Sequence, residues 1–545
     1  MSMQDTKKSQ TTKKRISNKS RFASLAVTEQ AVTAKQDKSI GCRLHYKKVR
    51  ASIDLSALSD IFAGLKSASI LGGNPAKADA DGYSCWAAEP KEIFEFWAGQ
   101  EDPLGKLQKT LDKYKLDSCP LDFVWDKLRR NDKKEEILHF AQNDIYTDKM
   151  PKGIFCGGWI GYFSYDLGRY IEPSAFSGTH TTIDDLAMPL IRLCFYDKVI
   201  CYDHTEEVFF LIALEMPDDV EKPDEKLASL EELLAQSEQG RSRQPAPADL
   251  DNIDLSQIRC NMDKDYYLRM VEKIKRYIYD GEVYQINFSQ RFECEYDAKA
   301  IELYHWQNRY NPSGYAAYID GGRFNIVSAS PEMFITITDG VICTKPIKGT
   351  RRRIDETGSK TAQAKQINTK NFNELLASEK ERAELNMIID LERNDVARIC
   401  KPGSRSMVQP RTIETYPTVF HAVATVEGRL RDDITFCDIL KAMFPGGSIT
   451  GAPKIRSMEI IEQTEPTARG VYTGSIGFLG IDGNFCLNIA IRTVIITAQK
   501  AFAQTGGGIV ADSDAQAEWQ ETITKARALL AGIRAVQKRK KELKI

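Results

Sequence analysis

A polar stretch at residues 236–254 divides this chain into two parts and sets the first limit on its fold. The stretch is rich in Gln, Ser, Arg and Pro, a composition typical of linkers, and apolar patterns lie on both sides of it. With 545 residues the chain is too long for one ordinary core, so we expect two domains or one large two-lobed domain. The predicted organisation is a disordered tail at 1–40, a first region at 41–235 with a charged surface insertion at 128–148, the linker at 236–254, and a second region at 255–537.

Both regions contain patterns typical of sheet strands. Leu190–Tyr202 and Glu207–Leu214 are rich in apolar residues and are predicted as successive strands. After the linker, apolar residues at helical spacing predict a helix over Tyr267–Ile278 that ends near Gly281, a residue suited to a C-cap. Val283–Phe292 is predicted as the strand that follows this helix.

Composition excludes several classes of function. The formal net charge is -1, which does not favour nucleic acid or an anionic membrane surface as a partner. No apolar run reaches the roughly 20 residues that a membrane helix needs. The 12 cysteines form no Cys-x-x-Cys pair and the histidines no His-x-x-x-His spacing, so zinc ribbons and redox dithiols are not expected. Scattered cysteines in a chain of this size favour a reduced, cytoplasmic protein.

Lys348 is a candidate nucleophile. Val341–Ile347 is a β-branched strand pattern, and Gly349 and Thr350 are predicted to turn the chain after it. A lysine at a strand end can point into a cleft, where desolvation and neighbouring cations lower its pKa and make the amine nucleophilic. The alternative is a surface lysine in a basic loop, and the residues by themselves leave both interpretations open.

Two Glu-x-x-Glu motifs form a candidate metal site. Glu381 and Glu384 share one helix face, and so do Glu518 and Glu521, because residues three apart are neighbours on a helix. Two such faces brought together would offer carboxylate oxygens without Cys or His, a set that favours Mg²⁺ over zinc. The alternative is a pair of solvated helix faces.

Glu332 is a candidate general acid, since a buried carboxyl at the mouth of a strand has a raised pKa. It follows the strand and Ser-Pro turn of Ser328–Pro331, and its alternative is a helix-capping role. Two glycine-rich turns, Pro445–Pro453 and Gln504–Val510, could bind a carboxylate through backbone N–H groups. Neither turn matches a phosphate loop or a dinucleotide fingerprint, so a nucleotide is not expected.

Two further residues stand out in apolar surroundings. His421 lies in an apolar stretch and is interpreted as a core histidine with a satisfied hydrogen bond. Arg492 lies inside the strand pattern Leu487–Ile496, where a buried charge needs a partner. A substrate carboxylate would be a natural partner for this guanidinium.

Taken together, these motifs resemble the chorismate-utilising enzymes, the family of anthranilate synthase component I, aminodeoxychorismate synthase component I and the isochorismate synthases. The resemblance covers about residues 44 to 535. The motifs that carry it are Gly157–Gly168, Ser328–Glu332, Pro346–Thr350, Ile389–Asp395, Gly446–Lys454 and Gly506–Asp512. The resemblance implies an α+β fold with two lobes of antiparallel sheet facing one another, flanked by helices, with the site between them.

The resemblance also implies roles for single residues. It assigns Mg²⁺ to Glu384 and Glu521, with Glu381 and Glu518 in the outer shell, and the metal to the ring carboxylate of chorismate. It assigns the other carboxylate to Tyr472, Arg492 and the amides near Gly507 and Gly508. His421 and Thr450 would lie near the ring and its leaving hydroxyl, and Glu332 would protonate the 4-hydroxyl.

Lys348 distinguishes the subfamilies, because anthranilate synthases commonly carry alanine in Pro-Ile-Ala-Gly-Thr. The lysine implies an aminodeoxychorismate synthase with a covalent intermediate, acting toward p-aminobenzoate and folate. No cysteine lies in a Gly-x-Cys-x-Gly turn, so we expect ammonia from a separate glutamine amidotransferase, and a separate lyase downstream. The alternatives are an anthranilate synthase component I and an inactive partner-binding relative. Ser67–Gly73 only loosely resembles the segment that binds tryptophan in relatives.

Overall fold

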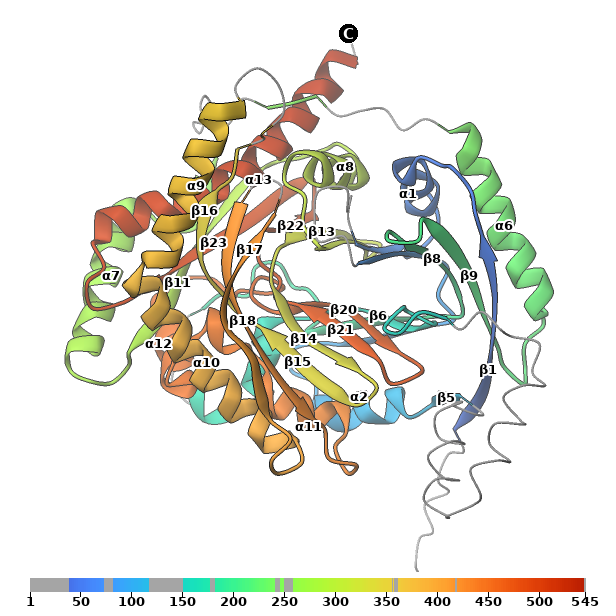
Figure 1. Cartoon of the computed structure of the whole chain (residues 1–545), viewed down its shortest axis with the longest axis horizontal. Helices are drawn as coiled ribbons and strands as arrows, with labels where there is room; N and C mark the ends of the chain where they lie inside the picture. The colour runs from blue at the N-terminus through green and yellow to red at the C-terminus, as the bar shows by residue number, and fades with distance from the viewer. Residues whose placement is uncertain are drawn as a thin grey trace, which may run out of the picture. The chain divides into compact units, whose positions relative to one another are not determined.

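Two sheets form the framework of the chain (Figure 1). The computed structural model describes residues 39–72, 82–116, 150–176, 182–240, 246–248, 258–354, 356, 361–416 and 419–543. The predicted insertion at 128–148 lies outside these residues, as do residues 1–38 of the predicted tail and most of the predicted linker. Ile40, the last residue assigned to the tail, already begins the first strand.

The first sheet is antiparallel except for one parallel pair between β1 and β5. Its strands run in the order β10 (Arg259–Cys260), β11 (Gln285–Glu295), β23 (Lys500–Ile509), β22 (Thr493–Thr497), β13 (Phe324–Ser330), β12 (Tyr315–Asp320), β2 (Ser69–Leu71), β3 (Tyr83–Ala87), β8 (Lys198–Asp203), β9 (Val208–Glu215), β1 (Ile40–Val49) and β5 (Tyr114–Leu116), and β19 (Gly451–Ala452) pairs with β11.

The second sheet is antiparallel throughout its described pairs. Its strands run in the order β16 (Ile347–Arg352), β18 (Val419–Arg429), β15 (Val341–Lys345), β14 (Met333–Thr338), β21 (Phe485–Asn488), β20 (Ser475–Gly480), β6 (Gly158–Phe163), β7 (Ile191–Tyr196) and β4 (Glu92–Phe96), and β17 (Ser406–Thr415) pairs with β18.

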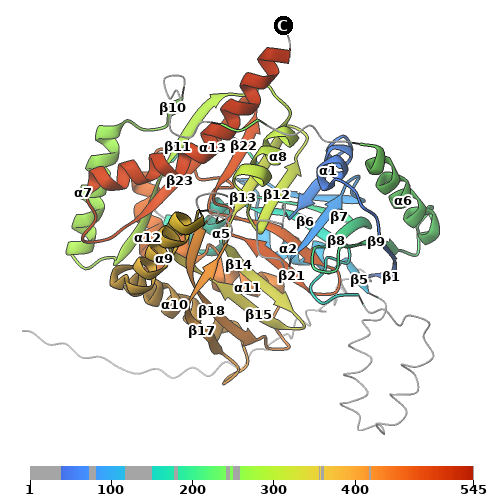
Figure 2. The same cartoon turned by 45° about the horizontal axis from the view of Figure 1, so that its top comes forward.

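Helices cover the outer faces of both sheets (Figure 1). They are α1 (Leu55–Ala63), α2 (Pro103–Leu111), α5 (Gly168–Ile171), α6 (Pro223–Gln239), α7 (Lys264–Tyr279), α8 (Ala300–Tyr310), α9 (Thr361–Ala377), α10 (Glu379–Ile399), α11 (Phe436–Met443), α12 (Lys454–Thr464) and α13 (Ala515–Leu543), with the 3₁₀ turns η2 (Tyr165–Leu167), η3 (Pro173–Phe176) and η4 (Gly447–Ile449). The turned view shows α13 running along the first sheet beside α7 and α8 (Figure 2). The predicted α+β fold with two facing antiparallel sheets is confirmed.

The apolar core lies in layers. One cluster joins the inner faces of the two sheets, with Ile160 and Ile476 from the second sheet packing with Phe210 and Ile326 from the first. A second cluster joins the first sheet to α1, α6, α8 and α13, and a third contains residues of α2, α10 and α11 with strands of the second sheet. Burying apolar side chains on both faces of each sheet is the main stabilising contribution of this arrangement.

Strands from both sides of the predicted linker share each sheet. In the first sheet β2 pairs with β12, and in the second sheet β6 pairs with β20. The regions 41–235 and 255–537 are therefore interleaved within each sheet.

One predicted strand is two strands. Leu190–Tyr202 was expected to be continuous, but β7 ends at Tyr196 in the second sheet and β8 begins at Lys198 in the first. Asp197 stands at the crossing, where its carboxylate accepts a bond from Lys226 Nζ at 2.6 Å and is only 3 % exposed. A buried charge at this point needs its lysine partner, and the apolar pattern on either side gave no sign of the change of sheet.

The helix and the strand predicted after the linker agree with the structure. The helix predicted over Tyr267–Ile278 is α7, and Gly281 follows its C-cap with φ +78°. The strand predicted from Val283 is β11. Within the described part of the chain, no helix is long and apolar enough to cross a membrane.

Candidate active site

Lys348 lies on a bulge in strand β16. Ile347 pairs with Val423 and Thr350 with His421, so two residues of β16 stand opposite one residue of β18. Gly349 adopts φ +94°, and a Cβ there would approach the Glu381 carboxyl carbon at 2.9 Å. The expected turn at Gly349 and Thr350 is wrong, because the strand continues to Arg352. A bulge changes the direction of a side chain without ending the strand, which is how Lys348 comes to face the site.

The Lys348 amine lies among groups of both charges. Its Nζ donates to the carbonyl oxygen of Ser448 at 3.2 Å. Burial lowers the pKa of Lys348, the carboxylates of Glu332, Glu384 and Glu521 act in the opposite direction, and Lys525 lowers it further. The net shift is downward, which increases the fraction of neutral, nucleophilic amine at neutral pH.

Glu332 lies beside this lysine, and both side chains form a hydrogen bond with Ser448. The carboxyl is 6 % exposed and accepts a hydrogen bond from Ser448 Oγ at 2.8 Å. Burial raises the pKa of Glu332 against the opposing charge of Lys348. The element after Glu332 is strand β14 and not a helix, so the alternative of a helix-capping glutamate is wrong. A carboxyl with a raised pKa next to an amine with a lowered one is suited to proton transfer.

The four glutamates lie on two helices near Lys348. Glu381 accepts a bond from Arg351 at 2.8 Å, and its Oε2 is buried without a hydrogen-bond partner among the described residues. Glu518 accepts a bond from Ser513 at 2.7 Å, and Glu521 pairs with Lys525 at 2.8 Å. The carboxylates of Glu384 on α10 and Glu521 on α13 both act to raise the pKa of Lys348, so both helices contribute charge near this amine.

These carboxylates fit a hard cation by their chemistry. All the candidate donors are oxygens, and one carboxylate oxygen of Glu381 has no described protein partner. In the described part of the chain, no group of three or more His, Cys, Asp or Glu converges closely enough to hold a metal by itself. Any cation here would therefore take part of its coordination from substrate or water, as Mg²⁺ commonly does.

The guanidinium of Arg492 has no acid partner among the described residues. Arg492 adopts φ +50° between β21 and β22, so the strand predicted over Leu487–Ile496 is wrong at this position. Its backbone carbonyl accepts a bond from the Ala329 N–H, but its guanidinium makes no hydrogen bond or ion pair with any described residue. Burial lowers the pKa of this guanidinium. A cleft of about 470 Å³ is lined by Arg492 and His421, and no Asp or Glu is among its described lining residues. An unpaired cation in such a cleft favours an anionic ligand.

His421 is buried next to this arginine. Its Nδ1 lies 2.8 Å from Thr350 Oγ1, and its side chain belongs to β18. Burial lowers the pKa of His421 to about 4, and the charge of Arg492 adds to this effect. The ring is therefore neutral at neutral pH and can donate or accept one hydrogen bond without carrying charge.

The two glycine-rich segments have different structures. Gln504–Val510 was expected to be a turn, but its residues up to Ile509 lie inside strand β23, where Gly507 pairs with Phe288 of β11. A Cβ on Gly507 would lie 2.9 Å from Glu518 Oε2, and one on Gly506 would lie 3.0 Å from the Tyr472 hydroxyl. The missing side chains thus let Glu518 and Tyr472 approach the strand backbone, and Gly508 occupies the next position along it.

The other glycine-rich segment, Pro445–Pro453, contains the 3₁₀ turn η4. Thr450 follows this turn, is fully buried, and donates its hydroxyl to the carbonyl of Gly446 at 3.0 Å. Its hydroxyl is thus engaged within its own turn. Ser448 of the same turn makes both contacts to the Lys348 and Glu332 pair.

The motifs did not single out two residues that the structure places at the site. Ser448 lies within Gly446–Lys454, and its role depends on a contact across 100 positions of sequence to Lys348. Lys525 donates to the carbonyl of Gly506 at 2.9 Å and pairs with Glu521. The i,i+4 spacing of Glu521 and Lys525 in the sequence would have predicted their ion pair on a helix.

Comparison with known proteins identifies relatives along most of the chain. The sequence matches the chorismate binding enzyme family over residues 86–531. It is 40% identical over 392 residues to aminodeoxychorismate synthase component 1 of Bacillus subtilis, covering 72% of this chain and 79% of that protein. It is 38% identical over 386 residues to anthranilate synthase component 1 of Pseudomonas aeruginosa, covering 70% of this chain and 75% of that protein.

Solved structures agree with this result. Anthranilate synthase component I of Streptococcus pneumoniae is similar with a TM-score of 0.62 at 29% identity, covering 82% of this chain and 92% of that one. The menaquinone-specific isochorismate synthase of Escherichia coli shares the fold with a TM-score of 0.60 at 15% identity, covering 92% and 95%. The resemblance inferred from the motifs is confirmed: the chain belongs to the chorismate binding enzyme family.

Proposed function

We propose that this chorismate-utilising enzyme is an aminodeoxychorismate synthase component I, which replaces the 4-hydroxyl of chorismate by an amino group. The observation that carries the proposal is Lys348, whose amine lies on a bulge beside the buried carboxyl of Glu332 and shares Ser448 with it. A covalent nucleophile needs a partly neutral amine and a nearby acid for the leaving group. Relatives named aminodeoxychorismate synthase and anthranilate synthase have similar identity to the chain, so the distinction depends on this residue.

In the proposed mechanism, Lys348 and Glu332 act in one step. The neutral amine attacks C2 of the ring, both ring double bonds shift, and the 4-hydroxyl leaves as water after taking the proton of Glu332. Ammonia then attacks C4, both double bonds shift back, and the C2–N bond to Lys348 breaks. Two easier substitutions thereby replace one difficult substitution.

The remaining residues hold the two carboxylates of chorismate. Glu384 and Glu521 would hold Mg²⁺ at the ring carboxylate, with Glu381 and Glu518 in its outer shell. When bound, the metal supplies charge stabilisation at that carboxylate. Arg492, Tyr472 and the amides of Gly507 and Gly508 would hold the enolpyruvyl carboxylate. His421 and Thr450 would lie near the ring and the leaving hydroxyl.

The nitrogen source in this proposal is a separate glutamine amidotransferase. Relatives with this activity are named component 1, which supports a second component that supplies ammonia. A separate lyase would then convert the product to p-aminobenzoate.

The identity of the product tests this proposal. The chain is supplied with chorismate, Mg²⁺ and ammonium, and the product is analysed by mass spectrometry and fluorescence. We expect 4-amino-4-deoxychorismate, with retention of the enolpyruvyl group. Fluorescent anthranilate formed without any added lyase would identify an anthranilate synthase instead, and no ammonium-dependent product would support an inactive relative.

The pH dependence should depend on Glu332. The reactive state needs a neutral Lys348 and a protonated Glu332, so kcat/KM falls when the lysine gains a proton at low pH and when the glutamate loses its proton at high pH. Burial lowers the pKa of Lys348 and raises that of Glu332. Both shifts increase the population of the state with a neutral lysine and a protonated glutamate. We expect a bell-shaped profile. In Glu332→Gln, kcat should fall roughly 10²- to 10⁴-fold and one limb of the profile should disappear. An unchanged profile in this variant would contradict the general-acid role.

A further inference from the structure

A buried glutamate on helix α10 takes no part in the proposed mechanism. Glu392 is 4 % exposed and shares the buried face of α10 with Ile388, Ile389 and Val396. A carboxyl in such surroundings is costly to bury unless it forms hydrogen bonds. The motif Ile389–Asp395 contains this residue, and the contacts of its side chain indicate what it does.

The Glu392 carboxyl contacts the turn η4. It accepts a bond from the backbone N–H of Gly447. The absence of a side chain lets Gly447 come this close, because a Cβ there would collide with Leu391 Cδ2 and would lie 3.4 Å from Glu392 Oε1. The turn therefore packs directly on two consecutive residues of α10.

The chain that follows η4 is bound to the same helix. Lys454 Nζ donates to Asp395 Oδ2 at 2.7 Å and to the carbonyl of Met443 at 3.1 Å. Asp395 lies three residues after Glu392 on the buried face of α10. Helix α10 thus contacts the segment 447–454 at both ends, through Glu392 at one end and through Asp395 at the other.

Glu392 is mostly neutral at neutral pH. Burial raises the pKa of this carboxyl to about 8. The charges of Asp395 and Glu332 add to the rise, and the charge of Lys454 opposes it. A neutral carboxyl accepts an N–H bond as an amide oxygen does, so glutamine is a close substitute at this position.

Ser448 follows Gly447 directly and contacts both reactive groups of the proposed mechanism. Its hydroxyl donates to Glu332 at 2.8 Å, and its carbonyl accepts from Lys348 Nζ at 3.2 Å. Burial raises the pKa of Glu332, whereas the charge of Lys348 and the bond from Ser448 lower it. Hydrogen bonds weaken steeply as their geometry departs from the optimum, so a shift of the turn would weaken both contacts.

We propose that Glu392 is a positioning residue for the reaction, which holds η4 against α10 and so keeps Ser448 in contact with Glu332 and Lys348. The inference rests on the proposed function, because it concerns the acid and the nucleophile of that mechanism. Glu392 acts through Ser448 and exchanges no proton with the substrate. The same helix carries the proposed metal ligand Glu384, so α10 would position the metal and, through the turn, the general acid.

The test compares Glu392→Met with Glu392→Gln in steady-state assays with chorismate, Mg²⁺ and ammonium. Methionine has a similar volume but offers the Gly447 N–H only a weak acceptor. We expect kcat to fall about tenfold and the KM for chorismate to change less than about twofold, because Glu392 affects the reacting groups and not the substrate carboxylates. The high-pH limb set by Glu332 should move up by about half a pH unit or more, since the bond from Ser448 no longer lowers the pKa of the acid. Glu392→Gln keeps a neutral acceptor and should restore both kcat and the limb.

Two further variants locate the effect at the turn. Ser448→Ala removes the hydroxyl bond to Glu332 directly, so adding Glu392→Met to it should lower kcat by no more than about twofold further. Gly447→Ala displaces the turn from its other side, because the added Cβ would collide with Leu391. It should move the limb in the same direction even if Glu392→Met is poorly folded.

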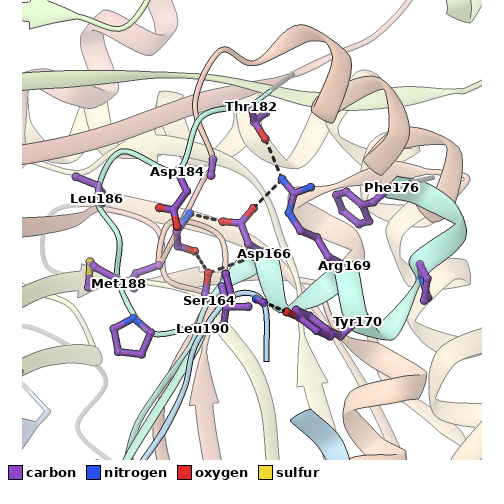
Figure 3. Close-up of a pocket in the computed structure, with 17 residues that line it drawn as sticks. Ser164, Asp166, Arg169, Tyr170, Phe176, Thr182, Asp184, Leu186, Met188 and Leu190 are labelled. Atoms are coloured by element: carbon purple, nitrogen blue, oxygen red, sulfur yellow. Dashed lines mark hydrogen bonds and ion pairs between the residues drawn. The ribbon is translucent and has the colours of Figure 1, made fainter. Parts of the chain in front are cut away.

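Glu462→Gln is the matched control for the loss of a buried carboxylate. Glu462 is 7 % exposed on α12 and accepts bonds from Arg169 and Thr182, two residues that line a separate cavity of about 470 Å³ beside η2 (Figure 3). This variant should lower the unfolding temperature, because it weakens a buried ion pair, and should keep the wild-type kcat and pH profile.

The outcomes separate this inference from the proposed function. Wild-type kcat and an unmoved limb in both Glu392→Met and Gly447→Ala would overturn the positioning role and leave the proposed function intact. Losses that multiply fully in the double variant would also overturn it, because Glu392 would then act independently of Ser448. A wild type that forms no 4-amino-4-deoxychorismate would refute the proposed function, and this inference with it.

Discussion

Replacing Lys348 by alanine is expected to abolish the formation of 4-amino-4-deoxychorismate while the protein remains folded. The side chain makes one described hydrogen bond, to the carbonyl of Ser448, so little of the packing depends on it. Removing a covalent nucleophile commonly lowers kcat by about 10⁴-fold or more. Steady-state assays with chorismate, Mg²⁺ and ammonium measure the loss, and mass spectrometry shows whether any remaining turnover gives a different product, such as anthranilate.

Two controls separate nucleophilic from electrostatic roles. Lys348→Arg keeps a positive charge beside Glu332 but cannot supply a neutral amine, because arginine stays protonated at these pH values. It should be as inactive as the alanine variant. Lys401→Ala removes an exposed lysine paired with Asp432 and should behave as wild type. Substantial activity in Lys348→Ala or Lys348→Arg would refute the covalent role.

Removing the metal, or one of its proposed ligands, is expected to have the second large effect. Chelation should abolish activity, and added Mg²⁺ should restore it. Glu384→Gln should lower kcat by roughly 10²-fold or more, because a bound cation contributes several kcal/mol of charge stabilisation. The free energy of unfolding provides an independent measurement, since Mg²⁺ with chorismate should stabilise the wild type and should not stabilise this variant.

The matched control for this test is on the same helix. Glu379 lies in the first turn of α10 with a side chain 86% exposed, and Glu379→Gln should retain both activity and stabilisation by Mg²⁺ with chorismate. Full activity of the wild type after exhaustive chelation would contradict the magnesium proposal.

The residue types of the candidate site could be named from the sequence, but their arrangement could not. The glutamate pairs, Arg492 and Lys348 could be named because each is an unusual residue type for its local pattern. Their meeting at one place could not be derived from spacing, since α10 and α13 are far apart in the chain. The charges of Glu384 and Glu521 both act on Lys348 because the strands of the two sheets pair in one particular order.

Errors in the sequence analysis have a common physical cause. The turn expected at Gly349 is a bulge, the turn expected at Gly506 is a strand, and the strand expected across Asp197 changes sheets. In each case the conformational preferences of the local residues allowed either structure. Pairing with the neighbouring strand determined which of the two formed. Glycine permits a turn or a closely approached strand equally well, so only the neighbour distinguishes them.

The sequence by itself determined the family, the alternation of strands and helices, and the residue types available for chemistry. Tertiary structure decided that Lys348 and Glu332 share Ser448, and that the Arg492 guanidinium has no hydrogen-bond or ion-pair partner among the described residues. The physical reason is the distance along the chain over which each effect acts. Periodicity and propensity act over a few residues, whereas the burial and charge that set the reactivity of these groups come from segments separated by 100 positions or more, as for Lys348 and Ser448.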